Sequence, residues 1–313
     1  MTEEWTRRPY TLTFWFGELR LFAVTLRSAT RAGNPLARLG EARPAEPDFP
    51  TVPPDVDVLV LRSEPIAAHL PPVTVRDGTL RYVPAQFERY FADLRGTFAS
   101  YLGTFSPKSR STLQRKVRKA AEILGGEVSW REYRKPDEMR EFHRLARMVS
   151  ATTYQERRLD AGLPGEDAFL CRMDELARAE QVRGYLLFAD KRPVAYQYCP
   201  VVDGALVYQY VGYDPEFQRA SPGTVLQYLV LEHLFAEQRI RYFDFTEGEG
   251  AHKEFFATGS VRCANILYFQ ATWRSRGLVA LHRGVDRNAA AVARLLERWG
   301  LKGQMKKLFR GTR

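Results

Sequence analysis

The sequence contains little cysteine and no long uncharged apolar run. Its three cysteines are Cys171, Cys199 and Cys263. They are too few and too scattered to predict a disulfide framework or a zinc site, so we expect no metal and a reducing, cytoplasmic environment. The best apolar stretch, Phe14 to Leu26, is interrupted by Glu18 and Arg20, which argues against a membrane-spanning helix. The N-terminus is acidic and lacks the apolar segment of a secretory signal.

Two nucleotide-binding motifs are also absent. No G-x-G-x-x-G motif follows an expected strand, and there is no Walker A loop. A doubly wound Rossmann sheet is therefore not expected. The second half of the chain instead predicts two helices, a three-strand meander, a helix and two strands. This order is typical of an α+β fold with a mixed, mostly antiparallel sheet flanked by helices. The expected strands span residues 184–189, 194–202, 205–213, 240–245 and 264–270.

Basic residues outnumber acidic ones, and the formal net charge is +10. Six basic residues and no acidic residue lie between Pro107 and Lys119, and six more lie between Arg298 and Arg313. Such runs favour a polyanionic partner, which includes nucleic acid, an acidic membrane face or a phosphorylated cofactor. The alternative is that they form solvated faces. The first run has no interleaved aromatic residue, which argues against nucleic acid.

A long amphipathic helix is expected near the C-terminus. Apolar residues recur at steps of three or four from Leu278 to Trp299, and arginines lie elsewhere on its surface. A basic tail follows. An interfacial helix on an anionic inner leaflet has this pattern, so a peripheral membrane location is one interpretation. The other is that the apolar stripe packs on the sheet.

A turn that opens a helix is the first candidate site. It comprises Ser221, Pro222, Gly223 and Thr224, just beyond a strand that ends at Gly212 and Tyr213. Ser221 is expected to cap the helix, and Pro222 suits its first turn. The free N–H groups and the helix dipole make such a turn a candidate anion site, to which Arg219 could add an ion pair. An ordinary cap with nothing bound is the alternative.

The second candidate is a glycine-punctuated loop that follows a buried strand. It carries Asp244, Glu247, Glu249, His252 and Lys253. Such a set can orient an amine, accept its proton and reach a phosphate through the lysine. His252 titrates near neutrality without special tuning, so we expect it to be the base, with Glu247 orienting the amine or the imidazole. A polar hairpin loop is the alternative, and a metal site is less expected.

Two copies of the triplet Tyr-Gln-Tyr occur on neighbouring expected strands. The tyrosines are Tyr196, Tyr198, Tyr208 and Tyr210. Alternation along a strand would place both tyrosines of a triplet on one face, where they could line an acceptor groove or simply pair across the strands. A polar patch that includes Tyr154 and Gln155 follows a helix and could also contact the acceptor.

From about Ser106 to Gln270 the sequence resembles the GNAT superfamily of acyl-CoA-dependent N-acyltransferases. It is most similar to the branch described as cellulose-biosynthesis-associated (CelD-like) acetyltransferases, which is related to the Fem-type aminoacyltransferases. The residues that carry the resemblance are the basic helix 108–116, Gly212-Tyr213-Asp214, Ser221-Pro222-Gly223, Asp244-Phe245, Gly248 and Lys253.

The sequence departs from the family pattern in two places. His252 precedes Lys253 where the family usually has tyrosine. In the pyrophosphate pattern Q/R-x-x-G-x-G/A, Arg219 fits the first position, but Pro222 and Thr224 then stand at the glycine positions.

The resemblance implies two tandem GNAT-like domains, of which the N-terminal one is degenerate. The expected boundaries are 1–104 for that half, 105–275 for the acyltransferase domain, and 276–313 for the amphipathic helix and tail. Acyl-CoA would be the co-substrate, with its pyrophosphate at the helix start and its carbonyl polarised by a backbone N–H near Val211. An amine would then attack the thioester directly.

The acceptor is the least determined part of this hypothesis. The layout is similar to that of bacterial ceramide synthases, which N-acylate a sphingoid base, so a membrane-borne primary amine is the leading expectation. An acetyltransferase acting on a polysaccharide or amino-sugar precursor and an aminoacyl-tRNA-dependent Fem-like transferase are the alternatives. The absence of a long coiled-coil arm in the second half argues against the latter.

Overall fold

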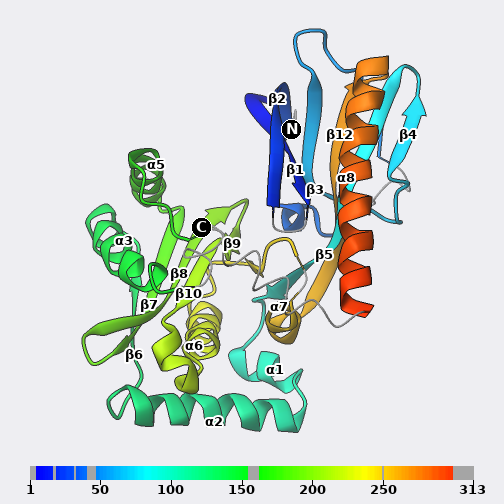
Figure 1. Cartoon of the computed structure of the whole chain (residues 1–313). Coiled ribbons are helices and arrows are strands. Elements are labelled where there is room, and N and C mark those ends of the chain that lie inside the picture. The colour runs from blue at the N-terminus through cyan, green and yellow to red at the C-terminus, as the bar shows by residue number, and fades with distance from the viewer. Residues whose placement is uncertain are drawn as a thin grey trace. The chain divides into compact units, whose positions relative to one another are not determined.

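The computed structural model describes residues 5–16, 19–31, 33–40, 47–153, 162–248 and 250–298 (Figure 1). The chain forms two compact units. The first comprises Met1–Ala32, Glu41–Gln86 and Arg262–Arg313, and the second comprises Gly33–Gly40 and Phe87–Val261. These boundaries differ from the expected 1–104, 105–275 and 276–313. The reason is that a late strand, β12, returns to pair with β3 and so joins the C-terminal segment to the N-terminal one.

The second unit is built on a mixed, mostly antiparallel sheet, as expected. Its strands follow the order β5-β11-β9-β8-β7-β6, and β10 also pairs with β8. The pairs are antiparallel except for β9 and β11, which are parallel. The bounds are β5 Thr79–Asp93 (from Phe87 in this unit), β6 Ser129–Tyr133, β7 Val182–Ala189, β8 Arg192–Val202, β9 Ala205–Val207, β10 Tyr210–Tyr213 and β11 Tyr242–Asp244.

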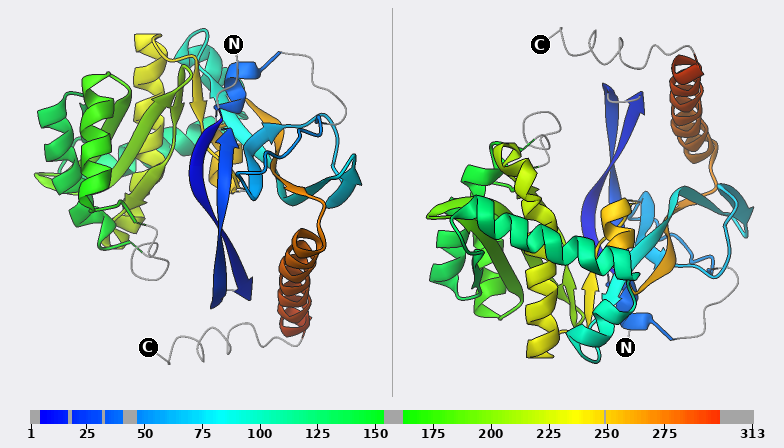
Figure 2. Two further views of the ribbon diagram at one scale, coloured as in Figure 1. Left: turned by 90° about the horizontal axis from the view of Figure 1, so that it is seen from above. Right: turned by 90° about the horizontal axis from the view of Figure 1, so that it is seen from below.

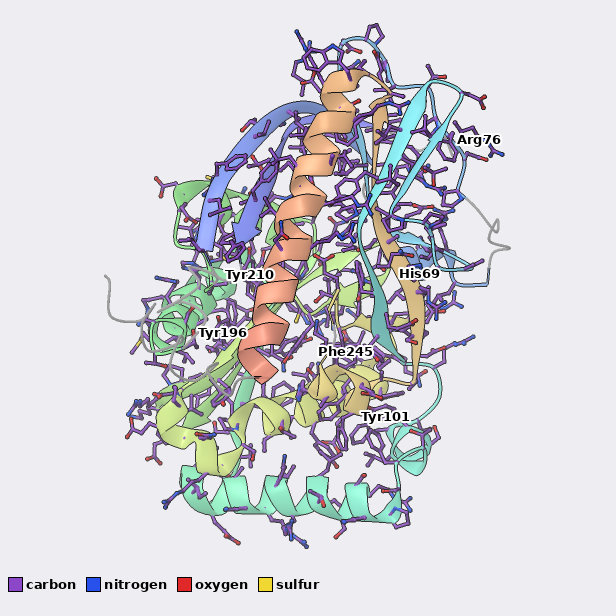
Figure 3. All side chains as sticks on the ribbon, turned by 45° about the vertical axis from the view of Figure 1, so that its right-hand side comes forward. His69, Arg76, Tyr101, Tyr196, Tyr210 and Phe245 are labelled. Atoms are coloured by element: carbon purple, nitrogen blue, oxygen red, sulfur yellow. The ribbon has the colours of Figure 1, made fainter. Side chains whose placement is uncertain are left out.

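Helices cover both faces of this sheet (Figures 1 and 2). Side chains of α3 Pro136–Ser150 and α5 Asp167–Arg178 form one core with β6, β7 and β8. The opposite core contains Tyr101 and Phe245, both labelled in Figure 3. The elements on that face are α1 Phe98–Gly103, α2 Pro107–Leu124, the 3₁₀ helix η2 Pro215–Ala220, α6 Pro222–Glu237 and α7 Ala251–Phe256. A further 3₁₀ helix, η1, spans Pro35–Arg38.

Helix α2 begins and ends where the sequence predicts. The Ser106 hydroxyl accepts a hydrogen bond from the Ser109 N–H at 3.1 Å, and Pro107 occupies the first turn. Gly125 ends the helix with φ +116°, a left-handed conformation that glycine adopts without steric cost.

The first unit combines a smaller sheet with one long helix. Its elements are β1 Thr6–Phe16, β2 Leu19–Arg31, β3 Val58–Pro65, β4 Val73–Arg76, residues 79–86 of β5, β12 Gly259–Gln270 (from Arg262 in this unit) and α8 Trp273–Arg298. Helix α8 packs on β1. Val279 is buried in the core of this unit, and His282 Nδ1 lies 2.8 Å from the Tyr82 hydroxyl.

This packing bears on the predicted C-terminal helix. The helix is confirmed. Leu278 and Val285 of its apolar stripe pack in the core of this unit beside Val279, whereas Leu281 of the stripe is exposed. The stripe residues from Ala289 onward and the basic tail from Trp299 lie outside the residues whose side chains are described. Within the part of the chain that the structure describes, no helix is long and apolar enough to cross a membrane.

Gly184 on β7 allows α3 to approach the sheet closely. A Cβ atom at this position would lie 2.6 Å from the ring of Phe142. We expect Gly184→Ala to lower the free energy of unfolding by about 1–3 kcal/mol, because this ring has to move within a packed core. Urea denaturation measures the change. Gly103→Ala is the control, since its Cβ would meet nothing within 4 Å. Equal stability of the two variants would contradict the packing described here.

Candidate active site

Strands β9 and β11 separate in the middle of the sheet. Their parallel pairing runs from Ala205 opposite Tyr242 to Val207 opposite Asp244, and the Tyr208 N–H then donates to the Asp244 carbonyl at 2.9 Å. Beyond this point β11 stops and the Phe245 N–H donates to the Tyr90 carbonyl, while β10 pairs with β8. The expected single strand 205–213 is therefore two strands, and the edge of β10 remote from β8 is left open.

The open edge of β10 presents backbone N–H groups. The Asp214 N–H donates to the Val194 carbonyl of β8 at 2.8 Å, and the register pairs Val211 with Gln197. Only alternate residues of an antiparallel strand bond to the same neighbour, so the N–H groups of Val211 and Tyr213 point away from β8. The predicted donor near Val211 therefore faces the gap between the strands.

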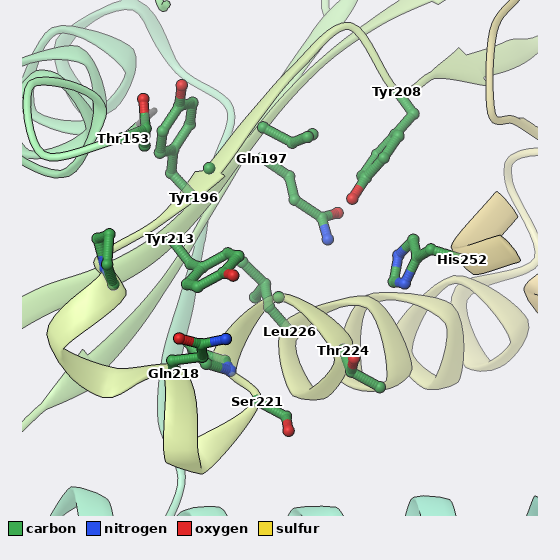
Figure 4. Close-up of a pocket in the computed structure, with 15 residues that line it drawn as sticks. Thr153, Tyr196, Gln197, Tyr208, Tyr213, Gln218, Ser221, Thr224, Leu226 and His252 are labelled. Carbon is green, nitrogen blue, oxygen red and sulfur yellow. The ribbon is translucent and has the colours of Figure 1, made fainter. Parts of the chain in front are cut away.

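A pocket of about 580 Å³ occupies this gap. Its lining residues come from β8, β10, η2, α6 and α7, from the segments that join β9 to β10 and η2 to α6, and from the segment after α3 (Figure 4). They are Thr153, Tyr196, Gln197, Tyr208, Val211, Gly212, Tyr213, Pro215, Gln218, Ser221, Pro222, Gly223, Thr224, Leu226 and His252. Gly212 is needed here, because a Cβ atom would lie 2.7 Å from the Tyr196 ring and 2.8 Å from the Thr153 methyl group.

The turn before α6 lines the pocket but has a different geometry from the one expected. Ser221 occupies the N-cap position of α6 as predicted, but its side chain makes no capping hydrogen bond. Ser221 adopts φ +52°, and its N–H closes η2 by donating to the Gln218 carbonyl. The N–H groups of Thr224 and Val225 both donate to the Ser221 carbonyl. Among the described residues, the Gly223 N–H is left without an acceptor, which makes it the donor available to a bound anion.

The geometry changes the alignment of this turn with the pyrophosphate pattern. Arg219 is exposed and does not line the pocket, whereas Gln218 does. When the pattern begins at Gln218, its first glycine position falls on Ser221 and its last on Gly223. The positive φ of Ser221 is the conformation that favours glycine, which explains why that pattern has glycine there.

His252 lies on the short helix α7, at the other side of the pocket. Its ring stacks with the Tyr208 ring at 6.4 Å and meets the Phe256 ring edge-on at 5.0 Å. Burial lowers the pKa of His252 below 6.5, and the charges of Lys116 and Lys253 lower it further. Its Nε2 atom is buried and has no hydrogen-bond partner among the described residues. A neutral imidazole with a free nitrogen at a pocket can accept a proton.

The comparisons with known proteins agree with this geometry. Residues 107–254, just under half of the chain, match the family model of the acetyltransferase (GNAT) domain. These residues are a GNAT acetyltransferase domain. The chain is accordingly an acyl-CoA-dependent N-acyltransferase, with an acyl-CoA as its co-substrate. No curated protein matches the chain.

Solved structures resemble the fold at low sequence identity. FemX is 10% identical with a TM-score of 0.50, and the match covers 88% of this chain and 90% of FemX. This likeness shows a shared fold and nothing more. L-PGS from Bacillus licheniformis is 15% identical, with 72% of each chain covered and a TM-score of 0.45. A tandem GNAT protein from the clavulanic acid biosynthesis pathway is 14% identical, with 81% and 80% covered and a TM-score of 0.37.

Asp244, one of the predicted catalytic residues, holds the structure of the GNAT domain instead. It is fully buried, and its carboxylate accepts hydrogen bonds from the Arg89 guanidinium at 2.7 Å and the Asn34 amide at 3.0 Å. It also accepts the Thr246 N–H at 2.8 Å. The carboxylate is thus occupied by the chain itself and does not line the pocket. It holds the end of β11 and the start of the following loop.

Lys253 and Glu247 close that loop. The Lys253 ammonium donates to the Glu247 carbonyl at 2.6 Å and to the Thr246 hydroxyl at 3.4 Å. Burial lowers the pKa of Lys253, although the charge of Asp244 opposes the shift. Neither Lys253 nor Glu247 lines the pocket, so the structure does not bring them to it as predicted. Glu249 lies outside the described residues.

The predicted acceptor groove of four tyrosines does not form. Tyr196 and Tyr208 line the pocket, whereas Tyr198 and Tyr210 pack with Phe169 of α5. Tyr196 and Tyr198 both belong to the core that α3 and α5 form with the sheet. Tyr208 lies in the break between β9 and β10, so the alternation expected for one continuous strand does not hold. Tyr154 and Gln155 lie outside the described residues.

Sequence reasoning missed one polar residue of the pocket, Gln218. Thr153, from the polar patch that follows α3, and Gln197, from the first Tyr-Gln-Tyr triplet, also line it. Gln197 is almost fully buried, and its amide points into the pocket (Figure 4). Its Nε2 donates to Gln227 Oε1 at 3.3 Å, and no described residue donates a hydrogen bond to its Oε1. The position of Gln218 at the start of the pyrophosphate pattern was the one available signal.

A second polar cluster of the GNAT domain lies away from the pocket. Glu132, His233 and Glu237 place potential ligand atoms within 4.8 Å of one another. Arg134 bonds both carboxylates at 2.8 Å, and Arg183 also pairs with Glu237. Burial opposes ionisation of Glu132, but hydrogen bonds from His233 and Arg134 outweigh it and lower the pKa to about 2. The arginines already supply the positive charge that a metal ion would bring.

The buried ion pair of Asp244 and Arg89 leads to a stability prediction. We expect Asp244→Asn to lower the free energy of unfolding by about 3 kcal/mol, because the guanidinium loses its compensating charge within the protein. Chemical denaturation at pH 7 measures this. Asp93→Asn, which breaks the exposed pair with Arg95, serves as control and should cost clearly less. A mild effect at both positions would show that Asp244 does not organise the loop.

Proposed function

We propose that this pocket binds acyl-CoA and transfers its acyl group to a primary amine, with His252 as the base. The observation that supports this most directly is the separation of β9 and β11, which places outward-facing N–H groups of β10 and the free nitrogen of His252 around one pocket. The residues fit the co-substrate: the glycine at 212 keeps the pocket open, and the Gly223 N–H is available to the pyrophosphate.

The open edge of β10 would stabilise the transition state of acyl transfer. When an amine attacks a thioester, negative charge develops on the carbonyl oxygen. The Val211 N–H is fixed by the sheet and could donate a hydrogen bond to that oxygen. One such donor lowers the activation barrier by on the order of 3 kcal/mol. The C–N bond forms as the C–S bond breaks, and the sulfur leaves as the thiolate of CoA.

His252 would accept the proton of the attacking amine. A primary amine is largely protonated at pH 7, and only its neutral form is a nucleophile. The lowered pKa of His252 keeps the imidazole neutral at that pH, so Nε2 can take the proton from nitrogen and pass it to the departing thiolate. The Tyr208 phenol beside it stays protonated, because burial raises its pKa.

Replacement of His252 tests both the activity and the assignment. We expect the wild-type protein to release CoA thiol from acyl-CoA in the presence of an amine acceptor. His252→Ala should lower kcat by about 10²–10⁴-fold while the affinity for CoA stays unchanged. In the wild type, kcat should rise with pH through a pKa below 6.5 and then level off, since protonation disables the base. A stopped assay of thiol release across pH 5–9 measures this.

Glu247→Ala is the matched control, because its exposed side chain lies on the same loop without lining the pocket. If His252→Ala turns over at nearly the wild-type rate and its rate still falls at low pH, then another residue is the base. Failure of the wild type to bind CoA at all would remove the proposed function itself.

We propose further that the acceptor is a membrane-borne amine, such as a sphingoid base. The described part of α8 does not support contact with a membrane, because α8 packs on β1. The β1–β2 hairpin supports such contact (Figure 2). Large apolar side chains are exposed around its tip, namely Trp15, Phe16, Leu19, Leu21 and Phe22. The described strands β1 and β2 contain arginines and no acidic residue.

This composition suits the interface of an anionic membrane. Aromatic rings and aliphatic side chains enter the headgroup region, and arginines remain with the phosphates. The register of the hairpin shifts between Phe14 and Trp15, so apolar side chains are exposed on both strands near the tip. A peripheral position on the inner face of the membrane would bring the enzyme to a lipid amine.

A vesicle flotation assay tests the hairpin. The wild type should float with vesicles containing anionic phosphatidylglycerol, and the double variant Trp15→Ser, Leu19→Ser should bind about tenfold or more weakly, because two apolar side chains no longer leave water. Leu281→Ser is the control, since Leu281 is as exposed but lies on α8. If the wild type stays with protein-only fractions at low salt, the membrane-borne acceptor is wrong, and amino-sugar acceptors become the better candidates.

A further inference from the structure

Helix α2 carries cations that the protein itself does not neutralise. Six basic residues lie in its first thirteen positions, and none of them forms an ion pair with the described residues. Some arginines elsewhere in the second unit pair with carboxylates, as Arg89 does with Asp244 and Arg192 with Asp214, while others such as Arg144 and Arg219 form no ion pair with the described residues. What distinguishes α2 is that six such cations are gathered on one helix, which favours an anion from outside the chain.

One of the six, Lys116, lies on the inner face of the helix. It follows the buried Leu113 by three residues and precedes the buried Ala120 by four, which places all three on one face. Lys116 is accordingly half-buried, as is Arg110 six residues earlier, whereas Arg115, Arg118 and Lys119 are exposed. An ammonium group partly removed from water loses hydration that a carboxylate or phosphate would replace.

The inner face of α2 meets the elements that form the pocket. Helix α2 packs against η2 and α6, and these two helices flank the Ser221 turn (Figure 1). The charge of Lys116 is also felt inside the pocket, because it contributes, after burial, to the lowered pKa of His252. Lys116 thus lies on a helix that packs against both elements beside the Ser221 turn, and its charge reaches His252.

We propose that Lys116 binds a phosphate group of the nucleotide part of acyl-CoA, so that the binding site extends from the Ser221 turn onto α2. The inference rests on the proposed function, since acyl-CoA is the anion which that function brings to this pocket. The turn itself supplies little: Pro222 has no N–H, and the N–H groups of Thr224 and Val225 are used within the helix. A cation on the neighbouring helix would complete a site that the turn leaves short of donors.

An RNA donor would use this helix differently. A nucleic acid backbone would contact the exposed face, where Arg115, Arg118 and Lys119 lie, and its binding would fall steeply with salt. The segment 107–119 contains no aromatic residue on which bases could stack. The inner position of Lys116 therefore favours a small nucleotide held in the pocket.

Isothermal titration of the purified full chain with CoA tests the proposal. Lys116→Ala should weaken CoA binding about 10-fold to 100-fold, as loss of a charge-assisted hydrogen bond does. Lys119→Ala, on the exposed face of the same helix, is the matched control and should bind like the wild type. Lys116→Arg should recover part of the loss. Circular dichroism and thermal melting verify that each variant is folded.

Titrations with dephospho-CoA and 4′-phosphopantetheine identify the phosphate. If Lys116 contacts the 3′-phosphate, its replacement removes the wild-type preference for CoA over dephospho-CoA. If it contacts the pyrophosphate, the variant loses equal affinity for CoA and dephospho-CoA and less affinity for 4′-phosphopantetheine. Either result supports the proposal. Lys116→Ala should also move the acid limb of the pH–rate profile to higher pH, since a cation near His252 is gone.

Three results would overturn the proposal or its basis. Unchanged CoA affinity in Lys116→Ala overturns it while leaving the proposed function intact. Equal losses in Lys116→Ala and Lys119→Ala, together with tight binding of transfer RNA, would make α2 a nucleic acid surface instead. A wild-type protein that binds no CoA would refute the proposed function, which the Lys116 variant could not do alone.

Discussion

The parallel pairing of β9 with β11 ends at the hydrogen bond from the Tyr208 N–H to the Asp244 carbonyl, and the pocket depends on that ending. Backbone donors within a sheet are normally satisfied by the next strand. Here the next strand stops, because Asp244 is held by Arg89 and the chain turns to bond Tyr90. Among the described residues, no strand therefore pairs with the N–H groups on the open edge of β10, and these groups face the pocket.

The charges around the pocket follow from the same arrangement. The one carboxylate nearest the strand ending, Asp244, is enclosed by Arg89, Asn34 and the Thr246 N–H, so it does not offer a counter-charge to His252. Burial and two lysines then favour the neutral imidazole. A neutral base beside uncompensated cations is suited to a substrate that brings its own phosphates and an amine that must lose a proton.

Several elements could be predicted because their signals are local. Ser106, Pro107 and Gly125 determine the ends of α2 through hydrogen bonds and dihedral angles within a few residues. Two of the predictions that differ from the structure depend on contacts between residues far apart in the sequence. The break after Val207 depends on where β11 stops, and the alignment of the phosphate turn depends on Ser221 taking a positive φ, which its residue type does not indicate. The helix α7, which presents His252, was expected as loop because its six residues carry too little periodicity.

The sequence by itself determined the class of fold, the position of the turn at Ser221–Thr224 and the group of polar residues from Asp244 to Lys253, since each depends on composition and short-range spacing. Only the tertiary structure decided which of those polar residues face the pocket. Asp244 and Lys253 are used to hold the chain, and His252 is left free beside Tyr208. The physical reason is that a polar group is available for chemistry only when no neighbour satisfies it, and neighbours distant in sequence are brought together by folding alone.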